Sequence, residues 1–125
     1  MPKLYHVDIA RHAATADHKW IDNLLSHFDV PGVEGGRQGS PRRITADGIQ
    51  HIALVRILTS ELGLSVAESN ELAPRLLSAD SAPISLGNGL ELRLDLAEFR
   101  VNVNRLITDG VESVAPARRG RPPKR

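Results

Sequence analysis

The stretch that decides the fold lies in the middle of the 125-residue chain and reads Thr45-Ala46-Asp47-Gly48-Ile49-Gln50-His51-Ile52-Ala53-Leu54-Val55-Arg56-Ile57-Leu58-Thr59-Ser60-Glu61-Leu62-Gly63. Thr45 is a favourable N-cap, and glycine is typical of the position just past a helix end. The stretch therefore predicts a helix over residues 46–62. Its apolar residues surround the helix, so most of the circumference is expected to be buried. They are Ile49, Ile52, Ala53, Leu54, Val55, Ile57, Leu58 and Leu62.

Another helix is predicted directly after Gly63. Ser65-Val66-Ala67-Glu68 has the form of a capping box, in which the serine and the glutamate each accept a hydrogen bond from the other's backbone N–H. We expect this helix to run to about Leu77. Pro74 lies inside it and predicts a kink or an early end, because proline removes a helical hydrogen bond.

Two short helices are predicted before the central one, the first over about residues 6–13. The apolar residues of the second are Trp20, Ile21, Leu24 and Leu25. Thr15 is the expected N-cap of the second helix, and Asp17 lies near its positive end. Asp29-Val30-Pro31-Gly32 ends the pair, because proline cannot continue a helix and glycine favours a turn.

The segment between the short helices and the central helix is rich in glycine and arginine. It reads Gly32-Val33-Glu34-Gly35-Gly36-Arg37-Gln38-Gly39-Ser40-Pro41-Arg42-Arg43. This composition predicts a loop or a short hairpin with a flexible, cationic tip.

A second hairpin is predicted further along the chain. Gly87-Asn88-Gly89 separates Ile84-Ser85-Leu86 from residues 90–94, where apolar and polar residues alternate. Glycine and asparagine tolerate the positive φ angles of a tight turn. Because an isolated hairpin is marginally stable in water, we expect it to pair or pack with something, and a second subunit is one candidate.

The last predicted helix begins near Asp95-Leu96-Ala97-Glu98, which again resembles a cap. One face of this helix carries Phe99, Val103, Leu106, Gly110 and Val114. The spacing is typical of an amphipathic helix. This stripe fits two alternatives, the core of the same chain or a seam between two copies.

Composition indicates one small domain with appendages, because a chain of 125 residues with 41% hydrophobic residues buries one modest core. The absence of cysteine excludes disulfides, a thiolate nucleophile and a cysteine-ligated zinc site. No run approaches the roughly 18 to 20 apolar residues of a membrane span, and the N-terminus lacks the apolar stretch of a signal peptide. We therefore expect an intracellular protein outside the membrane.

Charge is distributed unevenly along the chain. Residues 118–125 carry five of the 16 basic residues and no acid, whereas residues 1–117 carry 11 basic against 15 acidic residues, a net charge of −4. A cationic arm of this kind favours a polyanion, because each lysine or arginine placed on a phosphate releases condensed counterions.

Four segments carry a resemblance to a known class of domain. They are Val7-Asp8-Ile9-Ala10, Val30-Pro31-Gly32-Val33-Glu34-Gly35-Gly36-Arg37, Arg42-Arg43-Ile44-Thr45-Ala46-Asp47 and Leu62-Gly63-Leu64-Ser65-Val66-Ala67-Glu68. With the predicted order of elements, about residues 4–77 resemble the DNA-binding domain shared by MerR-type regulators and small excisionase-like proteins. The resemblance implies a mainly α fold: a winged helix-turn-helix of about four helices, followed here by the β-hairpin and a C-terminal helix.

The chain departs from the MerR pattern in two places. Lys19-Trp20-Ile21-Asp22-Asn23 replaces the aromatic and arginine cluster that is usual late in the recognition helix. No separate effector-binding domain follows the fourth helix. The resemblance therefore implies DNA binding, but not drug or metal sensing.

In this class of domain the second helix enters the major groove and the wing contacts the adjacent backbone. The residues expected to read base edges are Thr15, Ala16, His18, Lys19 and Asn23. Arg37, Arg42 and Arg43 on the wing are expected at phosphates or in the minor groove, because a guanidinium donates two parallel hydrogen bonds and stays charged. Asp17 and Asp22 fit two alternatives, contacts to cytosine amino groups or a position turned away from DNA.

The tail Arg118-Arg119-Gly120-Arg121-Pro122-Pro123-Lys124-Arg125 closely resembles an AT-hook, whose core is Arg-Gly-Arg-Pro. Gly120 lets the backbone enter a narrow minor groove, Arg119 and Arg121 extend along its floor, and Pro122 stiffens the path. The remaining tail cations expected at DNA are Arg118, Lys124 and Arg125. Beyond about Ala115 the chain is expected to be disordered when free.

Three parts are therefore predicted: a DNA-binding domain over 1–78, a hairpin and helix for dimerisation or partner binding over 79–114, and a basic tail over 115–125. The expected partner is double-stranded DNA with A/T-rich flanks. A homodimer through residues 84–114 is expected, since doubling a small module raises affinity. The expected location is the cytoplasm, in association with the nucleoid.

Three functions fit these features. The first is a sequence-specific transcriptional regulator, and the second is an antitoxin that represses its own promoter while the hairpin and last helix bind a toxin. The third is an architectural protein of the excisionase or nucleoid type that bends A/T-rich DNA. We expect no enzyme and no cofactor, because Gly-x-Ser-x-Gly and a phosphate-binding loop are missing from the sequence. We expect no metal site, because the five histidines lack the spacing of a helical zinc site.

Overall fold

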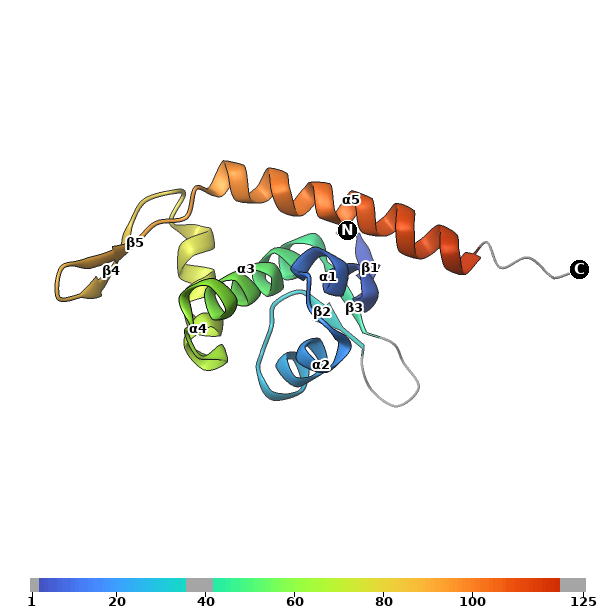
Figure 1. The fold of residues 1–125 in the computed structure, drawn as a ribbon, viewed down its shortest axis with the longest axis horizontal. Coiled ribbons are helices and arrows are strands. Elements are labelled where there is room, and N and C mark those ends of the chain that lie inside the picture. Colours follow the sequence, from blue (N-terminus) through green and yellow to red (C-terminus); the bar gives the residue numbers. More distant parts are fainter. Residues whose placement is uncertain (1–2, 36–41, 120–125) are drawn as a thin grey trace, which may run out of the picture.

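The structure, a computed structural model, describes residues 3–35 and 42–119, with side chains to Ser113. This part of the chain is mainly helical, as predicted, with two small sheets (Figure 1). Its elements are β1 (Leu4–His6), α1 (Val7–Ala14), α2 (His18–His27), β2 (Val33–Glu34), β3 (Arg43–Thr45), α3 (Ala46–Leu62), α4 (Val66–Ser78), β4 (Ile84–Gly87), β5 (Leu90–Leu92) and α5 (Leu96–Arg119).

Helix α3 forms the centre of the core and has the predicted bounds. The Gly48 N–H donates to Thr45 Oγ1 at 3.1 Å, and Gly63 adopts a left-handed conformation at the other end. Ile49, Ile52 and Val55 are fully buried. Burial was expected for eight apolar residues of α3, and for two of them this is wrong. Ile57 and Leu62 face solvent, with 42% and 52% of their surface exposed.

Helices α1 and α2 are joined by Thr15-Ala16-Asp17, and here one predicted cap is wrong. Thr15 does not cap α2 but ends α1 in a left-handed conformation (φ 54°). An N-cap requires extended backbone, which Asp17 has, and the Asp17 carboxylate accepts a hydrogen bond from the Trp20 N–H at 2.9 Å. The two helices therefore begin and end close to the predicted residues, but the cap is two residues later.

The predicted hairpin after α2 contains β2 and β3, which are antiparallel. Strand β1 adds a third strand on the other side of β3, with Tyr5 opposite Ile44. The sequence did not predict β1, because three residues are too short for a periodic signal. The side chain of Ile44 is completely buried and attaches this sheet to the core.

Helix α4 begins with the predicted capping box. The Glu68 N–H donates to Ser65 Oγ at 3.1 Å, and the Ser65 N–H donates to Glu68 Oε1 at 3.2 Å. The expected early end at Pro74 is wrong, because the helix continues to Ser78. Proline fixes a φ angle that suits a helix, and burial of Ala73 and Leu76 on either side of Pro74 holds this part against the core.

The second hairpin forms as predicted, with Gly87, Asn88 and Gly89 at positive φ. Its base is attached to the body through Ile84 and Leu92, which pack on the core. Its tip extends from one end of the molecule (Figure 1).

Helix α5 packs across α1 and α3 (Figure 1). Phe99, Val103 and Ile107 are buried in the common core. The apolar stripe of α5 was expected to be either core of the same chain or a seam between two copies. Its described part is core of the same chain, and the side chain of Val114 lies outside the described residues. Disorder from Ala115 onward is corrected up to Arg119, where α5 ends. Alanine and arginine are strong helix formers and supply four of the five residues from 115 to 119, the other being Pro116.

Candidate nucleic-acid interface

The solvent face of α2 is polar. Ile21 and Leu24 are buried at 2% and 1% exposure and attach the helix to the core, as expected. Trp20 is half-buried, with the Arg56 guanidinium 5.0 Å from its ring centroid. His18, Lys19 and Asn23 are exposed, so three of the five predicted reading residues lie on an accessible surface.

The other two predicted reading residues differ from each other. Thr15 is exposed in the turn between the helices. Ala16 is only 8% exposed and belongs to the core cluster, so its place among the base-reading residues is corrected. The turn between α1 and α2 therefore places this small side chain in the core and not on the accessible surface.

The structure gives both aspartates of α2 an intramolecular role. Asp17 caps the helix, which a side-chain oxygen at this position does by accepting an orphan backbone N–H. Asp22 Oδ1 accepts a hydrogen bond from Arg42 Nη1 at 2.8 Å. Both carboxylates remain exposed and contribute negative charge to this surface.

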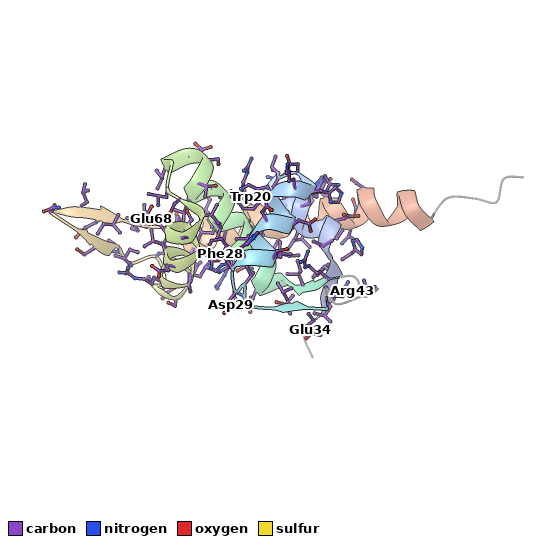
Figure 2. All side chains as sticks on the ribbon, turned by 90° about the horizontal axis from the view of Figure 1, so that it is seen from below. Trp20, Phe28, Asp29, Glu34, Arg43 and Glu68 are labelled. Carbon is purple, nitrogen blue, oxygen red and sulfur yellow. The ribbon has the colours of Figure 1, made fainter. Side chains whose placement is uncertain are left out.

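The arginines that we predicted on a wing occupy different environments in the structure. Arg42 is paired with Asp22, and its side chain is 23% exposed. Arg43 is exposed and lies opposite Glu34 and His6 in the sheet register. Figure 2 shows Arg43 and Glu34 near each other on the β2–β3 hairpin. Arg37 lies outside the described residues.

Of the predicted tail contacts, Arg118 and Arg119 belong to the last turn of α5. The extended path expected at Arg119 is therefore corrected in this structure, because the helix includes that residue. The remaining tail positions lie outside the described residues: Gly120, Arg121, Pro122, Lys124 and Arg125.

The part of the predicted interface on α2 and beside β2 and β3 has equal numbers of cationic and acidic residues. Lys19, Arg42 and Arg43 supply the cations, and Asp17, Asp22 and Glu34 supply as many carboxylates. A balanced surface attracts a polyanion weakly, because phosphate binding rises with the number of cations placed on phosphates. Strong attraction to a phosphate backbone therefore requires charge from other parts of the chain, and residues 118–125 carry it.

A partly buried polar network holds the segment between α2 and β2. His51 Nε2 lies 2.6 Å from Asn70 Oδ1, and Asn70 Nδ2 donates to the Asp29 carbonyl at 3.2 Å. Burial lowers the pKa of His51 below its ordinary value of 6.5, and the hydrogen bond to Asn70 opposes part of that shift. Burial thus favours the neutral imidazole at this position, where His51 and Asn70 connect α3, α4 and the segment before β2.

Sequence reasoning missed both the Asp22–Arg42 pair and the His51 network. The paired residues are 20 and 19 positions apart in the chain, and no local periodicity relates them. Ser26, which accepts a second hydrogen bond from Arg42 at 3.3 Å, was missed for the same reason.

A second surface lies between α4 and the β4–β5 hairpin. It is an open groove of about 490 Å³, whose apolar lining consists of Leu64, Leu72 and Leu86. Glu68, Glu71 and Arg75 also line it. Leu90 on the same hairpin is 64% exposed.

Within residues 3–35 and 42–119, no group of three histidine or acidic side chains is arranged to hold a metal ion. No helix in the same ranges combines the length and the apolar character needed to cross a membrane. The chain matches no protein-family model, and comparisons with curated proteins and with solved structures also found no match.

Proposed function

We propose that this protein is a sequence-specific DNA-binding transcriptional regulator. In this proposal α1 and α2 form a helix-turn-helix, β2 and β3 form the wing, and the basic tail binds an A/T-rich minor groove. The single observation that carries the proposal is the exposed polar face of α2 beside the wing, with Arg42 joining the two. This arrangement suits a helix that reads base edges next to a loop that sets register on the backbone.

The charge balance supports a division of labour between the folded domain and the tail. His18, Lys19 and Asn23 offer donors and acceptors for base edges. Arg43 offers an exposed guanidinium for a phosphate. The tail adds sequence-tolerant affinity, because arginines in a narrow minor groove respond to its width and potential more than to individual bases.

The test is selection of bound duplexes from a random pool by the full chain and by a version that ends at Ala117. A shared enriched motif from both proteins, with A/T-rich flanks only from the full chain, is the expected result. Asn23→Ala should lower affinity for the selected motif by about 1–3 kcal/mol while leaving non-specific binding unchanged. Thr108→Ala, an exposed change on α5, is the matched control. Failure of the full chain to bind any duplex in a salt-sensitive way would refute the proposal.

We further propose that the protein acts as a homodimer through the β4–β5 hairpin. The described part of the α5 stripe packs inside the same chain, so it is not available as a seam. Leu86 and Leu90 remain exposed on the hairpin, beside the apolar groove on α4. The same exposed leucines favour the second candidate, an antitoxin, if the element that covers them belongs to a toxin. A complex with an unrelated protein of fixed stoichiometry, in place of a homodimer, would favour that function.

A further inference from the structure

The side chain of Arg42 joins the foot of the wing to α2. Its Nη1 donates to Asp22 Oδ1 at 2.8 Å and its Nη2 donates to Ser26 Oγ at 3.3 Å. Asp22 and Ser26 are four residues apart, so their side chains lie on the same face of α2, one turn from each other. The planar guanidinium has two terminal donor nitrogens, so it reaches both acceptors at once. A lysine has a single nitrogen at the end of its side chain and lacks this geometry.

Arg42 directly precedes β3, and Arg43 is the first residue of that strand. The two neighbouring arginines have different surroundings. Ile44 is fully buried and Arg42 is 23% exposed, whereas Arg43 is exposed. The pair of adjacent arginines therefore divides into one that contacts the body and one that faces solvent.

We propose that Arg42 is a positioning residue that fixes the wing against α2, and that Arg43 is the wing residue that meets a phosphate. We call the contact of Arg42 with its two acceptors, Asp22 and Ser26, the clamp. The phosphate contact of Arg43 rests on the proposed DNA binding, whereas the clamp does not. Because α2 and the wing must reach adjacent parts of a duplex together, a fixed relative position removes the entropy cost of aligning them during binding.

The clamp and a direct phosphate contact at Arg42 predict opposite results for Asp22→Ala. If Arg42 served phosphate, removal of the carboxylate would release the arginine and delete a negative charge near DNA, so affinity would rise. If Arg42 serves as a clamp, the same substitution frees the wing and affinity falls. The sign of the change, together with the salt slope of Arg42→Ala, distinguishes the two roles, because loss of the Asp22 charge by itself favours binding in either case.

The first experiment uses the free, full-length protein. A double-mutant cycle with Asp22→Ala and Arg42→Ala should give a coupling of about 1.5- to 5-fold in the unfolding equilibrium constant, the size expected of an exposed ion pair. Arg42→Lys should lose part of this coupling although it keeps the charge. Arg43→Ala with Asp22→Ala is the control pair and should show no coupling. A coupling indistinguishable from the control would overturn the clamp, whatever the protein does with DNA.

The second experiment measures affinity for the selected duplex over a range of salt concentrations. Arg43→Ala should reduce the slope of log affinity against log salt by about 0.9, the value for one phosphate. Arg42→Ala and Asp22→Ala should each weaken binding about two- to fivefold with the slope unchanged, and the double variant should be no weaker than either single one. Tighter binding by Asp22→Ala, with a reduced slope for Arg42→Ala, overturns the assignment. If the wild-type chain binds no duplex, the proposed function fails, while the cycle in free protein still decides the clamp.

Discussion

His12 Nε2 on α1 lies 2.8 Å from Asp109 Oδ2 on α5, two side chains separated by 97 positions in the sequence. Gly110, the next residue on α5, is buried directly against the His12 ring. The pair is partly exposed, with 32% of the histidine and 58% of the aspartate side chain accessible, so its own contribution to stability is small. The close packing of α5 on α1 at Gly110 is expected to contribute more to stability than this pair does.

Gly110→Val should destabilise the fold. A Cβ at this position would lie 3.2 Å from His12 Cδ2, and further methyl groups would push the two helices apart. We expect a loss of about 1–3 kcal/mol in the free energy of unfolding, measured by denaturant titration. Thr108→Val, which introduces the same residue at an exposed position of α5, is the control. Equal stability of the two variants would contradict the close packing of α5 on α1.

Gly48→Ala should also destabilise, although alanine at a glycine in a helix interior normally adds up to about 1 kcal/mol of stability. A Cβ at Gly48 would lie 2.6 Å from the Pro31 carbonyl oxygen and 2.7 Å from Ile44 Cγ2. The loss is expected to be about 1–3 kcal/mol by chemical denaturation. Ser60→Ala, at an exposed position of α3, should change stability by less than about 0.5 kcal/mol. A stabilising Gly48→Ala would show that α3 and the sheet are further apart than described.

The stability of the protein should fall as the pH drops below about 6.5. Burial lowers the pKa of His51, so in this range the unfolded chain binds a proton that the folded chain does not. The stabilisation is complete above 6.5 and is lost as the pH falls toward the folded-state pKa, with a slope of at most about 1.4 kcal/mol per pH unit. The charged side chains that line the hollow beside His51 are Asp47 and Arg100, and their charges are opposite.

Unfolding titrations at several pH values measure this effect. His51→Gln should remove the His51 part of the slope, because glutamine does not titrate. His27→Gln serves as the control, since His27 is exposed on α2. If the pH dependence of stability persists in His51→Gln and disappears in His27→Gln, His51 is not its source and the prediction is wrong.

Arg119→Ala combined with Arg121→Ala should weaken binding to duplexes with A/T-rich flanks. Loss of two cations from DNA should reduce the salt slope by about 1.8, at roughly 0.9 for each phosphate neutralised. The control is Arg100→Ala with Arg105→Ala, which removes the same charge from exposed positions on α5. Affinity and slope that remain at wild-type values after loss of Arg119 and Arg121 would eliminate the hook.

Leu90→Asp should convert the proposed dimer to a monomer, because it places a charge in the centre of an apolar contact. Sedimentation equilibrium over a range of protein concentrations measures the change. Val101→Asp is the matched control, since Val101 is 67% exposed on α5 and lies outside the groove lining. Dimers that survive Leu90→Asp, or a wild-type chain that is monomeric throughout, would rule out the hairpin as the contact.

The sequence by itself determined the helices and hairpins whose signals are local. Thr45, Gly63, Ser65 and Glu68 cap neighbouring turns, and Asn88 lies between two glycines. Each of these acts on backbone within four residues, so the bounds of α3, α4 and the second hairpin could be predicted from adjacent letters. The exposed polar positions of α2 followed from the same helical period.

Only the tertiary structure decided which partners these elements meet. The burial of Ala16, the pairing of Arg42 with Asp22, and the packing of α5 on α1 join residues whose positions in the chain have no periodic relation. Such contacts depend on how the helices pack and on which side each strand faces. A linear pattern identified both arginines as cations, and the three-dimensional packing gave them different surroundings.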